Sequence, residues 1–110
     1  MAFNPNLPST SPYFSFSPEL MASLDPEGRF LEANPAWEGL SGLAPAELVG
    51  TPFLERLHPA DRPLALREIE RLSRGKQETV RFETRVPDRE GRLRHLAWTW
   101  TADPRQDRWY

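Results

Sequence analysis

The sequence predicts an α+β fold in which antiparallel strands are covered by helices, and three observations lead to this prediction. A turn sequence at residues 25–28 joins two short apolar segments. An apolar stripe at helical spacing runs through residues 61–74. The segments at residues 77–86 and 92–102 alternate between apolar and polar side chains, as half-buried strands do. A chain of 110 residues can bury one hydrophobic core, so we expect one domain.

The turn at residues 25–28 favours a tight β-hairpin. Pro26 presets φ, Asp25 can accept hydrogen bonds from the backbone ahead of it, and Gly28 tolerates a positive φ. Apolar positions on both sides supply the two strands: Leu20, Ala22 and Leu24 before the turn, and Phe30 and Leu31 after it.

Two short helices are expected after the hairpin. Asn34 can cap the first with its side-chain oxygen, Pro35 fills its first position, and Gly42 is suited to end it. The second has Pro45 at its first position and stops at Gly50. Both are too short to be stable alone in water, so packing on the sheet must hold them. The side chains expected to do this are Trp37, Leu40, Leu43, Leu48 and Val49.

A loop at residues 58–62 leads into the longest predicted helix. We expect Asp61 to be its N-cap and His58 to form a local hydrogen bond, with the helix running to about Arg74 and stopping at Gly75. An acid–base pair of His58 and Asp61 is the catalytic alternative, and we favour the structural interpretation. The buried stripe is Ala65, Ile69 and Leu72, with Leu66 beside it.

The C-terminal third predicts a second hairpin. In its first strand the side chains expected to point inward are Val80, Phe82, Thr84 and Val86. The turn lies at residues 88–91. The returning strand points inward with Leu96, Trp98 and Trp100, and outward with Leu93, His95, Ala97, Thr99 and Thr101. Residues 108–110 have the character of the start of a further strand.

The order of these motifs resembles the PAS domain, the sensory module of many bacterial signalling proteins. The resemblance rests on the first hairpin, the A-N-P-A-W helix start, the short A-P-A-E-L-V-G helix and the H-P-A-D-R loop. It implies a five-stranded antiparallel sheet with helices on one face. Its last strand is central, beside the first strand and the strand that holds Trp98. Residues 108–110 would then begin an incomplete last strand.

We assign residues 18–110 to this domain and residues 1–17 to an N-terminal linker or arm, because the latter are rich in Pro, Ser and Asn. The aromatic residues of the arm indicate that residues 13–17 lie on the domain or on a partner. In the family such a lead-in often contributes to dimerisation. An arm ordered only by crystal contacts is the alternative.

The resemblance also implies a pocket between the sheet and the helices. The side chains expected to line it are Leu57, Leu66, Ile69, Val80, Phe82, Leu96, Trp98 and Trp100. In the family that the chain resembles, the haem-binding branch needs a histidine on the long helix and the light-oxygen-voltage photoreceptors need a cysteine next to the flavin. The long helix here has no histidine and the chain has no cysteine, so both cofactors are disfavoured. No cofactor is therefore predicted. Trp100 is bulky, so we favour a plain hydrophobic core and keep an unknown small molecule as the alternative.

Composition excludes several partners and activities. With 14 basic and 16 acidic residues, the chain has no field that attracts nucleic acid, and no apolar run approaches the length of a membrane span. We therefore expect neither nucleic acid nor a membrane as a partner of this segment. His95 lies apart from any second metal ligand, so no metal site is predicted. No nucleophile–base motif is present, so we expect no catalysis by these residues.

The leading hypothesis is a regulatory PAS domain of a bacterial signalling protein, joined to a histidine kinase or diguanylate cyclase output domain. It would be cytoplasmic and homodimeric, although the parent protein could be membrane-anchored, and it would act through ligand binding or a rearrangement of two protomers. The alternative is a ligand-free interaction or dimerisation module that uses the outer sheet face. A metal- or carboxylate-dependent enzyme is a weaker third hypothesis.

Overall fold

The structure is a computed structural model that describes residues 12–73, 75, 78–103 and 108–109. Predictions about residues 1–11, Arg74, Gln77 and Tyr110 lie outside the described residues. The elements in chain order are α1 Pro12–Phe16, β1 Ala22–Leu24, β2 Phe30–Ala33, α2 Ala36–Ser41, α3 Pro45–Leu48, η1 Phe53–Arg56, η2 Pro59–Asp61, α4 Arg62–Ser73, β3 Thr79–Pro87, β4 Leu93–Asp103 and β5 Arg108–Trp109.

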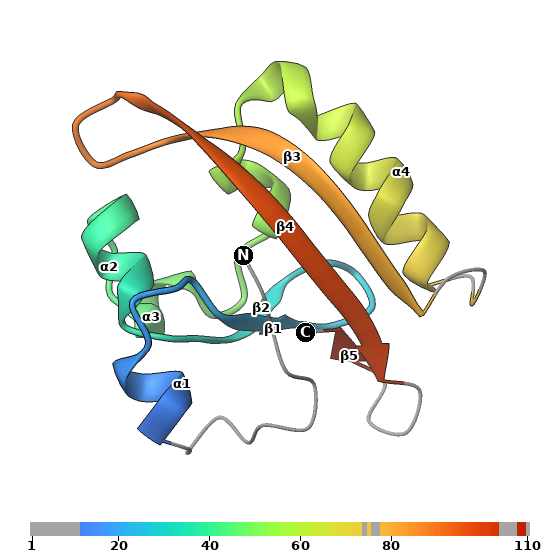
Figure 1. Ribbon diagram of the computed structural model, residues 1–110, viewed down its shortest axis with the longest axis horizontal. Helices are drawn as coiled ribbons and strands as arrows, with labels where there is room; N and C mark the ends of the chain where they lie inside the picture. The colour runs from blue at the N-terminus through green and yellow to red at the C-terminus, as the bar shows by residue number, and fades with distance from the viewer. Residues whose placement is uncertain (1–11, 74, 76–77, 104–107, 110) are drawn as a thin grey trace.

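The described strands form one five-stranded sheet in the order β2-β1-β5-β4-β3, and neighbouring strands in it pair antiparallel. The short β5 lies between the two hairpins, pairing Trp109 with Leu24 of β1 and with Ala102 of β4. The long β3–β4 hairpin and α4 dominate the view in Figure 1. This arrangement confirms the predicted α+β fold and the central position of the last strand.

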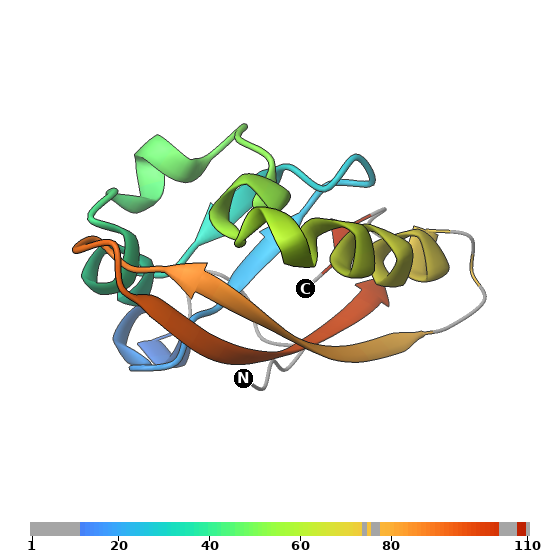
Figure 2. The ribbon, with the colours of Figure 1, turned by 90° about the horizontal axis from the view of Figure 1, so that it is seen from above.

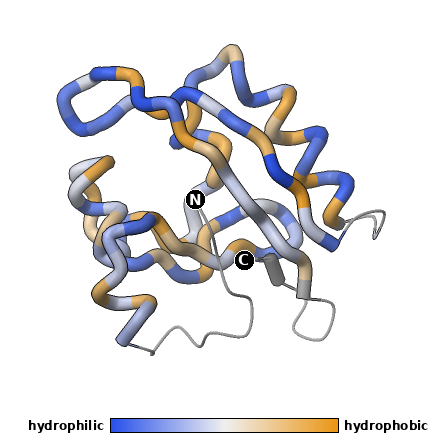
Figure 3. Tube along the Cα trace, viewed as in Figure 1, coloured by the Kyte–Doolittle hydropathy of each residue, from blue (hydrophilic) through white to orange (hydrophobic). Residues whose placement is uncertain are grey.

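The helices between the two hairpins gather over one face of the sheet. Figure 2 shows α4 running along the β3–β4 hairpin, with α1 at the opposite corner of the molecule. Hydrophilic residues dominate the β3–β4 turn in Figure 3. None of the helices in the described ranges is long and apolar enough to cross a bilayer.

Both hairpin turns are built in the same way. The Asp25 carboxylate accepts hydrogen bonds from the amides two and four residues further on, at 3.0 and 2.9 Å. Asp88 repeats this pattern, with both distances at 2.9 Å. Gly28 and Gly91 adopt positive φ values of 82° and 84°, a region that favours glycine. Both predicted turns are therefore confirmed, and the turn at residues 25–28 forms through the Asp25 acceptor and the Gly28 φ that were predicted for it.

The core is centred on an aromatic cluster between the sheet and the helices. Trp98 stacks on Trp37 at a ring distance of 5.9 Å and on Trp100 at 6.1 Å, and the edge of Phe53 meets Trp98 at 4.9 Å. The indole N–H of Trp98 donates to the Thr84 hydroxyl at 2.9 Å. The two late tryptophans point inward, as predicted.

Two apolar side chains lie elsewhere than predicted. On α4 the stripe of Ala65, Ile69 and Leu72 is buried, but Leu66 is 45% exposed. One residue advances the helix by about 100°, which turns Leu66 away from the sheet. Val49, the C-cap residue of α3, is 51% exposed, whereas Leu48 is buried.

Candidate functional site

Asn34 links two segments of backbone and does not cap α2. Its side chain is fully buried; Oδ1 accepts from the Met21 amide at 2.9 Å, and Nδ2 donates to the Glu19 carbonyl at 2.8 Å. The N-cap of α2 is Pro35, and no side-chain bond caps this helix. The predicted capping role of Asn34 is wrong, because the chain preceding β1 lies within reach of both polar atoms of its amide. Asn34 therefore fixes the entry to β1 against the start of α2.

Asp61 likewise does not cap the long helix. Asp61 is the last residue of η2, and α4 begins at the next residue. The Asp61 carboxylate binds Arg85 of β3. Hydrogen bonds from the Arg85 side chain and amide hold the pKa of the Asp61 carboxyl well below its usual range. The same carboxylate raises the pKa of Arg85. The predicted N-cap is wrong, and the pair instead joins the start of α4 to β3.

His58 forms the local hydrogen bond that the sequence predicted. Its Nδ1 accepts from the Ala60 amide at 3.1 Å. Its own amide donates to the Arg85 carbonyl at 2.8 Å. The ring nitrogen is thus engaged in shaping the loop, which supports the structural interpretation of residues 58–62.

Most of the side chains predicted to line a pocket are packed in the core. Leu57, Ile69, Val80, Phe82, Trp98 and Trp100 are buried in one cluster, and the partly buried Leu96 packs against it. Leu66 is exposed and does not belong to this set. The indole N–H of Trp100 is buried and has no hydrogen-bond partner in the described part of the chain.

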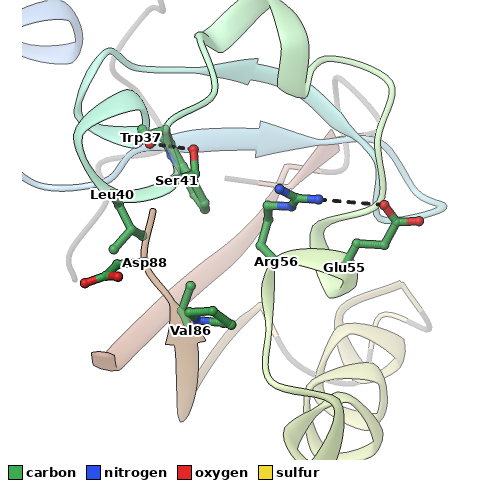
Figure 4. Close-up of a pocket in the computed structure, with 8 residues that line it drawn as sticks. Trp37, Leu40, Ser41, Glu55, Arg56, Val86 and Asp88 are labelled. Carbon is green, nitrogen blue, oxygen red and sulfur yellow. Dashed lines mark hydrogen bonds and ion pairs between the residues drawn. The ribbon is translucent and has the colours of Figure 1, made fainter. Parts of the chain in front are cut away.

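A cavity of about 220 Å³ lies beside this core, where α2, η1 and the end of β3 meet (Figure 4). Its lining is Trp37, Leu40 and Ser41 from α2, Glu55 and Arg56 from η1, and Val86, Pro87 and Asp88 from the end of β3 and its turn. None of the predicted pocket residues lines this cavity. It depends on three elements distant in sequence, which no local pattern reveals. The sequence offered one indication of this site, namely that two charged residues, Glu55 and Arg56, interrupt an apolar run.

Arg56 differs from the other polar groups that line the cavity. Its side chain is 25% exposed, and its buried Nε has no hydrogen-bond partner among the described residues. The nearest acid is Glu55, 57% exposed, whose carboxylate lies 3.9 Å from Nη2 and so beyond hydrogen-bond range. Figure 4 shows the Arg56 guanidinium turned toward the Glu55 carboxylate, with Trp37 and Ser41 on the other side of the cavity.

The remaining polar groups of the lining already have partners. The Ser41 hydroxyl donates to the Trp37 carbonyl at 2.7 Å and accepts from the Leu43 amide at 3.1 Å. Asp88 accepts from Arg94 Nε at 3.0 Å in addition to its two turn amides. These bonds, that from Arg94 above all, lower the pKa of the Asp88 carboxyl. Among the polar side chains of the lining, Arg56 is thus the one with a buried donor that has no hydrogen-bond partner in the described part of the chain.

The comparison with protein families decides the identity of the fold. A family model described as PAS fold matches residues 14–107. The chain belongs to the PAS-fold family. PAS domains are sensory modules and are in general non-catalytic. No curated protein matches the chain.

Solved PAS domains share this architecture. A domain of a sensory box sensor histidine kinase/response regulator from Geobacter sulfurreducens has a TM-score of 0.72 and 19% identity, covering 93% of this chain and 95% of its own. The PAS domain of the quorum-sensing receptor RpfR from Cronobacter turicensis, in complex with BDSF, has a TM-score of 0.69 and 18% identity, covering 86% and 90%. The PAS domain of an HTR-like protein from Haloarcula marismortui has a TM-score of 0.70 and 20% identity, covering 88% and 80%. At these identities the likeness establishes the fold.

In this PAS domain, the β3–β4 turn docks on α2 and closes one side of the cavity. The Arg89 amide donates to the Leu40 carbonyl at 2.7 Å. Gly42, which ends α2 with a φ of 78°, lies so close that an added Cβ would sit 3.3 Å from Arg89 Cβ. The cavity thus touches both the helical layer and the hairpin of the sheet.

Among the described residues, no group of three or more His, Asp or Glu side chains could hold a metal ion.

Proposed function

We propose that this chain is the sensory domain of a bacterial signalling protein, joined to a histidine kinase or diguanylate cyclase output domain. The observation that carries the proposal is the cavity between α2, η1 and the end of β3, with Arg56 among the residues of its wall. Two related structures support it: one belongs to a sensor histidine kinase/response regulator, and the other is a receptor PAS domain in complex with BDSF.

A ligand in this cavity would act on the sheet through the β3–β4 turn. The turn is anchored to α2 by the bond from the Arg89 amide to the Leu40 carbonyl. The returning strand β4 pairs with β5 at the centre of the sheet. A ligand that favours one position of the turn would therefore bias how β4 and β5 are presented to a second protomer. We also propose that the domain forms a homodimer and that it lies in the cytoplasm.

Native mass spectrometry of the protein purified from its own host tests this function. We expect a dimer mass and an added mass from a bound compound, and the addition should disappear after mild unfolding and refolding. A monomer without bound mass, at concentrations where full-length signalling is active, would contradict the proposal. The measurement reports ligand and subunit count together.

A ligand-free dimerisation module is the second candidate, and exposed aromatics favour it. On α1, Phe16 is 85% exposed and Tyr13 is 55% exposed, and Leu93 at the start of β4 is 45% exposed. Apolar surface of this kind is common at interfaces between protomers. Phe16→Ser should then dissociate the dimer in analytical ultracentrifugation. Under this second function, cavity variants would leave output unchanged.

A further inference from the structure

We propose that Trp37 couples the position of α1 to the position of β4, so that a displacement of α1 changes the sheet. The inference adds a second regulatory route to the proposed sensory function, and it does not require a ligand in the cavity. It starts from the indole N–H of Trp37, which donates to the Met21 carbonyl at 3.1 Å. Met21 belongs to residues 17–21, the lead-in segment, which joins α1 to β1.

The lead-in segment is bonded to the start of α2 by the side chain and the backbone of Asn34. The side chain accepts from the Met21 amide at 2.9 Å and donates to the Glu19 carbonyl at 2.8 Å. The Asn34 amide donates to the Met21 carbonyl at 2.9 Å. This carbonyl therefore receives two donors, one from the backbone of Asn34 and one from the ring of Trp37.

The other end of the lead-in segment is bonded to α1. The Ser17 amide donates to the Tyr13 carbonyl at 3.0 Å, and the Ser17 hydroxyl accepts from the Glu19 amide at 3.1 Å. Pro18 lies between these two residues and restricts the backbone further. Because these bonds and the proline stiffen the segment, a displacement of α1 is transmitted to Met21.

The bond between Trp37 and Met21 makes the ring follow the backbone. The indole N–H is the one hydrogen-bonding group of a tryptophan side chain, and Trp37 is fully buried. If the Met21 carbonyl moved away, this N–H would be buried without a partner, which costs free energy. The Trp37 ring is therefore expected to move with the lead-in segment.

The Trp37 ring also contacts the sheet. It stacks on Trp98 of β4, with 5.9 Å between the ring centroids and 21° between the ring planes. Trp98 is buried, and its own indole N–H donates to the Thr84 hydroxyl of β3. Because protein cores are packed at the density of organic crystals, a shift of one ring displaces the ring stacked on it. A movement of Trp37 therefore reaches β4, which pairs with β5 at the centre of the sheet.

The helix α1 has one side on the domain and another on the surface. Phe14 is its buried side chain, whereas Tyr13 and Phe16 are 55% and 85% exposed. An event on the exposed side that displaces α1 would thus act on the sheet through Trp37. This route is separate from the contact between α2 and the β3–β4 turn.

NMR spectra of the ¹⁵N-labelled protein test the coupling, with Phe14→Ala as the input. This substitution removes the buried side chain that holds α1 on the domain. We expect the indole resonance of Trp98 and the amide resonances of residues 96–100 to shift. Arg67→Gln is the control, because it lies on the exposed face of α4, at the opposite corner of the molecule from α1 (Figure 2). It should leave these resonances unchanged.

Replacing Trp37 with benzothienylalanine makes the test specific, because sulfur then takes the place of the indole N–H while the ring keeps its shape. The stack on Trp98 remains, but the bond to Met21 is lost. In this background Phe14→Ala should lose most of its effect on the Trp98 resonance. Phe53→Leu removes a different ring that contacts Trp98, at 4.9 Å, and the effect of Phe14→Ala should persist in that background. Amide dispersion reports whether each protein is folded.

The reverse direction gives a second measurement that needs no change at Trp37. Thr84→Val removes the acceptor of the Trp98 indole, and it should shift the amide resonances of residues 17–21, because coupling between two sites is reciprocal.

Three outcomes would overturn the inference. They are an unchanged Trp98 resonance in Phe14→Ala, an equal shift of that resonance in the benzothienylalanine protein, and unchanged amides of the lead-in segment in Thr84→Val. Failure of the sensory function would appear separately, as a monomer without bound mass in the native spectrum, and would leave this coupling intact.

Discussion

The carboxylate of Asp61 accepts three hydrogen bonds from one residue, Arg85: from its amide at 2.7 Å, from Nε at 3.1 Å and from Nη2 at 2.8 Å. The amide of His58 donates to the carbonyl of the same arginine at 2.8 Å. The loop before α4 is therefore bonded to β3 through the backbone amide of His58 and through the carboxylate of Asp61. This contact sets the position of the long helix on the sheet.

Asp61→Asn should lower the thermal midpoint at neutral pH, because it removes the charge that binds the guanidinium. The pKa of Asp61 is depressed in the folded state, so its contribution to stability is present above the unfolded pKa of about 4 and is lost as pH falls further. The gap between wild type and variant should therefore narrow in melts repeated below pH 4. Glu27→Gln, on an exposed turn, serves as the control and should melt like the wild type at neutral pH. Equal midpoints for Asp61→Asn and wild type at pH 7 would refute this role.

Asn34→Ala should cost about 2–3 kcal/mol in urea denaturation, because it leaves a buried amide and a carbonyl without partners. Asn34→Asp separates this role from capping. Aspartate is as good an N-cap as asparagine, but it cannot donate to the Glu19 carbonyl. We expect the Asp variant to be clearly destabilised at pH 7. A variant with wild-type stability would restore the capping interpretation.

The contrast between the two hairpin turns and the two supposed caps shows what the sequence could predict. The turns at Asp25 and Asp88 are closed by amides within four residues, so local chemistry determines them. Asn34 and Asp61 also satisfy local capping rules, yet their partners lie 13 and 24 residues away. Both side chains bind groups that are distant in sequence instead of the nearby helix amides. No pattern in the sequence shows which distant segment will lie next to them in the fold.

The same distinction applies to the core and the cavity. Alternation in β3 and β4 predicted that Trp98 and Trp100 point inward, since period two fixes the face of every side chain. The cavity at Arg56 is formed by the angle at which α2 and η1 meet the end of β3. That angle depends on packing of the whole core, so the residues that line the cavity could not be chosen from the sequence.

Thr84→Val should destabilise the domain by about 1–3 kcal/mol, although it preserves the shape of a buried side chain. The hydroxyl of Thr84 accepts the indole N–H of Trp98 at 2.9 Å, and valine leaves that donor buried without a partner. Thr84→Ser retains the acceptor and should cost only about 0.8 kcal/mol for the lost methyl group. Guanidinium unfolding followed by tryptophan fluorescence measures both. If Ser proved the more damaging substitution, the hydrogen bond would not be the reason for threonine here.

Gly42→Ala and Gly28→Ala form a matched pair that isolates the contact between α2 and the β3–β4 turn. Both glycines have positive φ, 78° and 82°, so alanine should cost each about 1–2 kcal/mol in backbone strain. An added Cβ at Gly28 meets nothing within 4 Å, whereas at Gly42 it would lie 3.3 Å from Arg89 Cβ. Gly42→Ala should therefore cost more, and it alone should shift the amide resonances of residues 88–91. Equal unfolding free energies for the two variants, with unchanged resonances of the turn, would contradict this prediction. They would show that the turn accommodates the added methyl group without resistance and cannot transmit a signal from the cavity to the sheet.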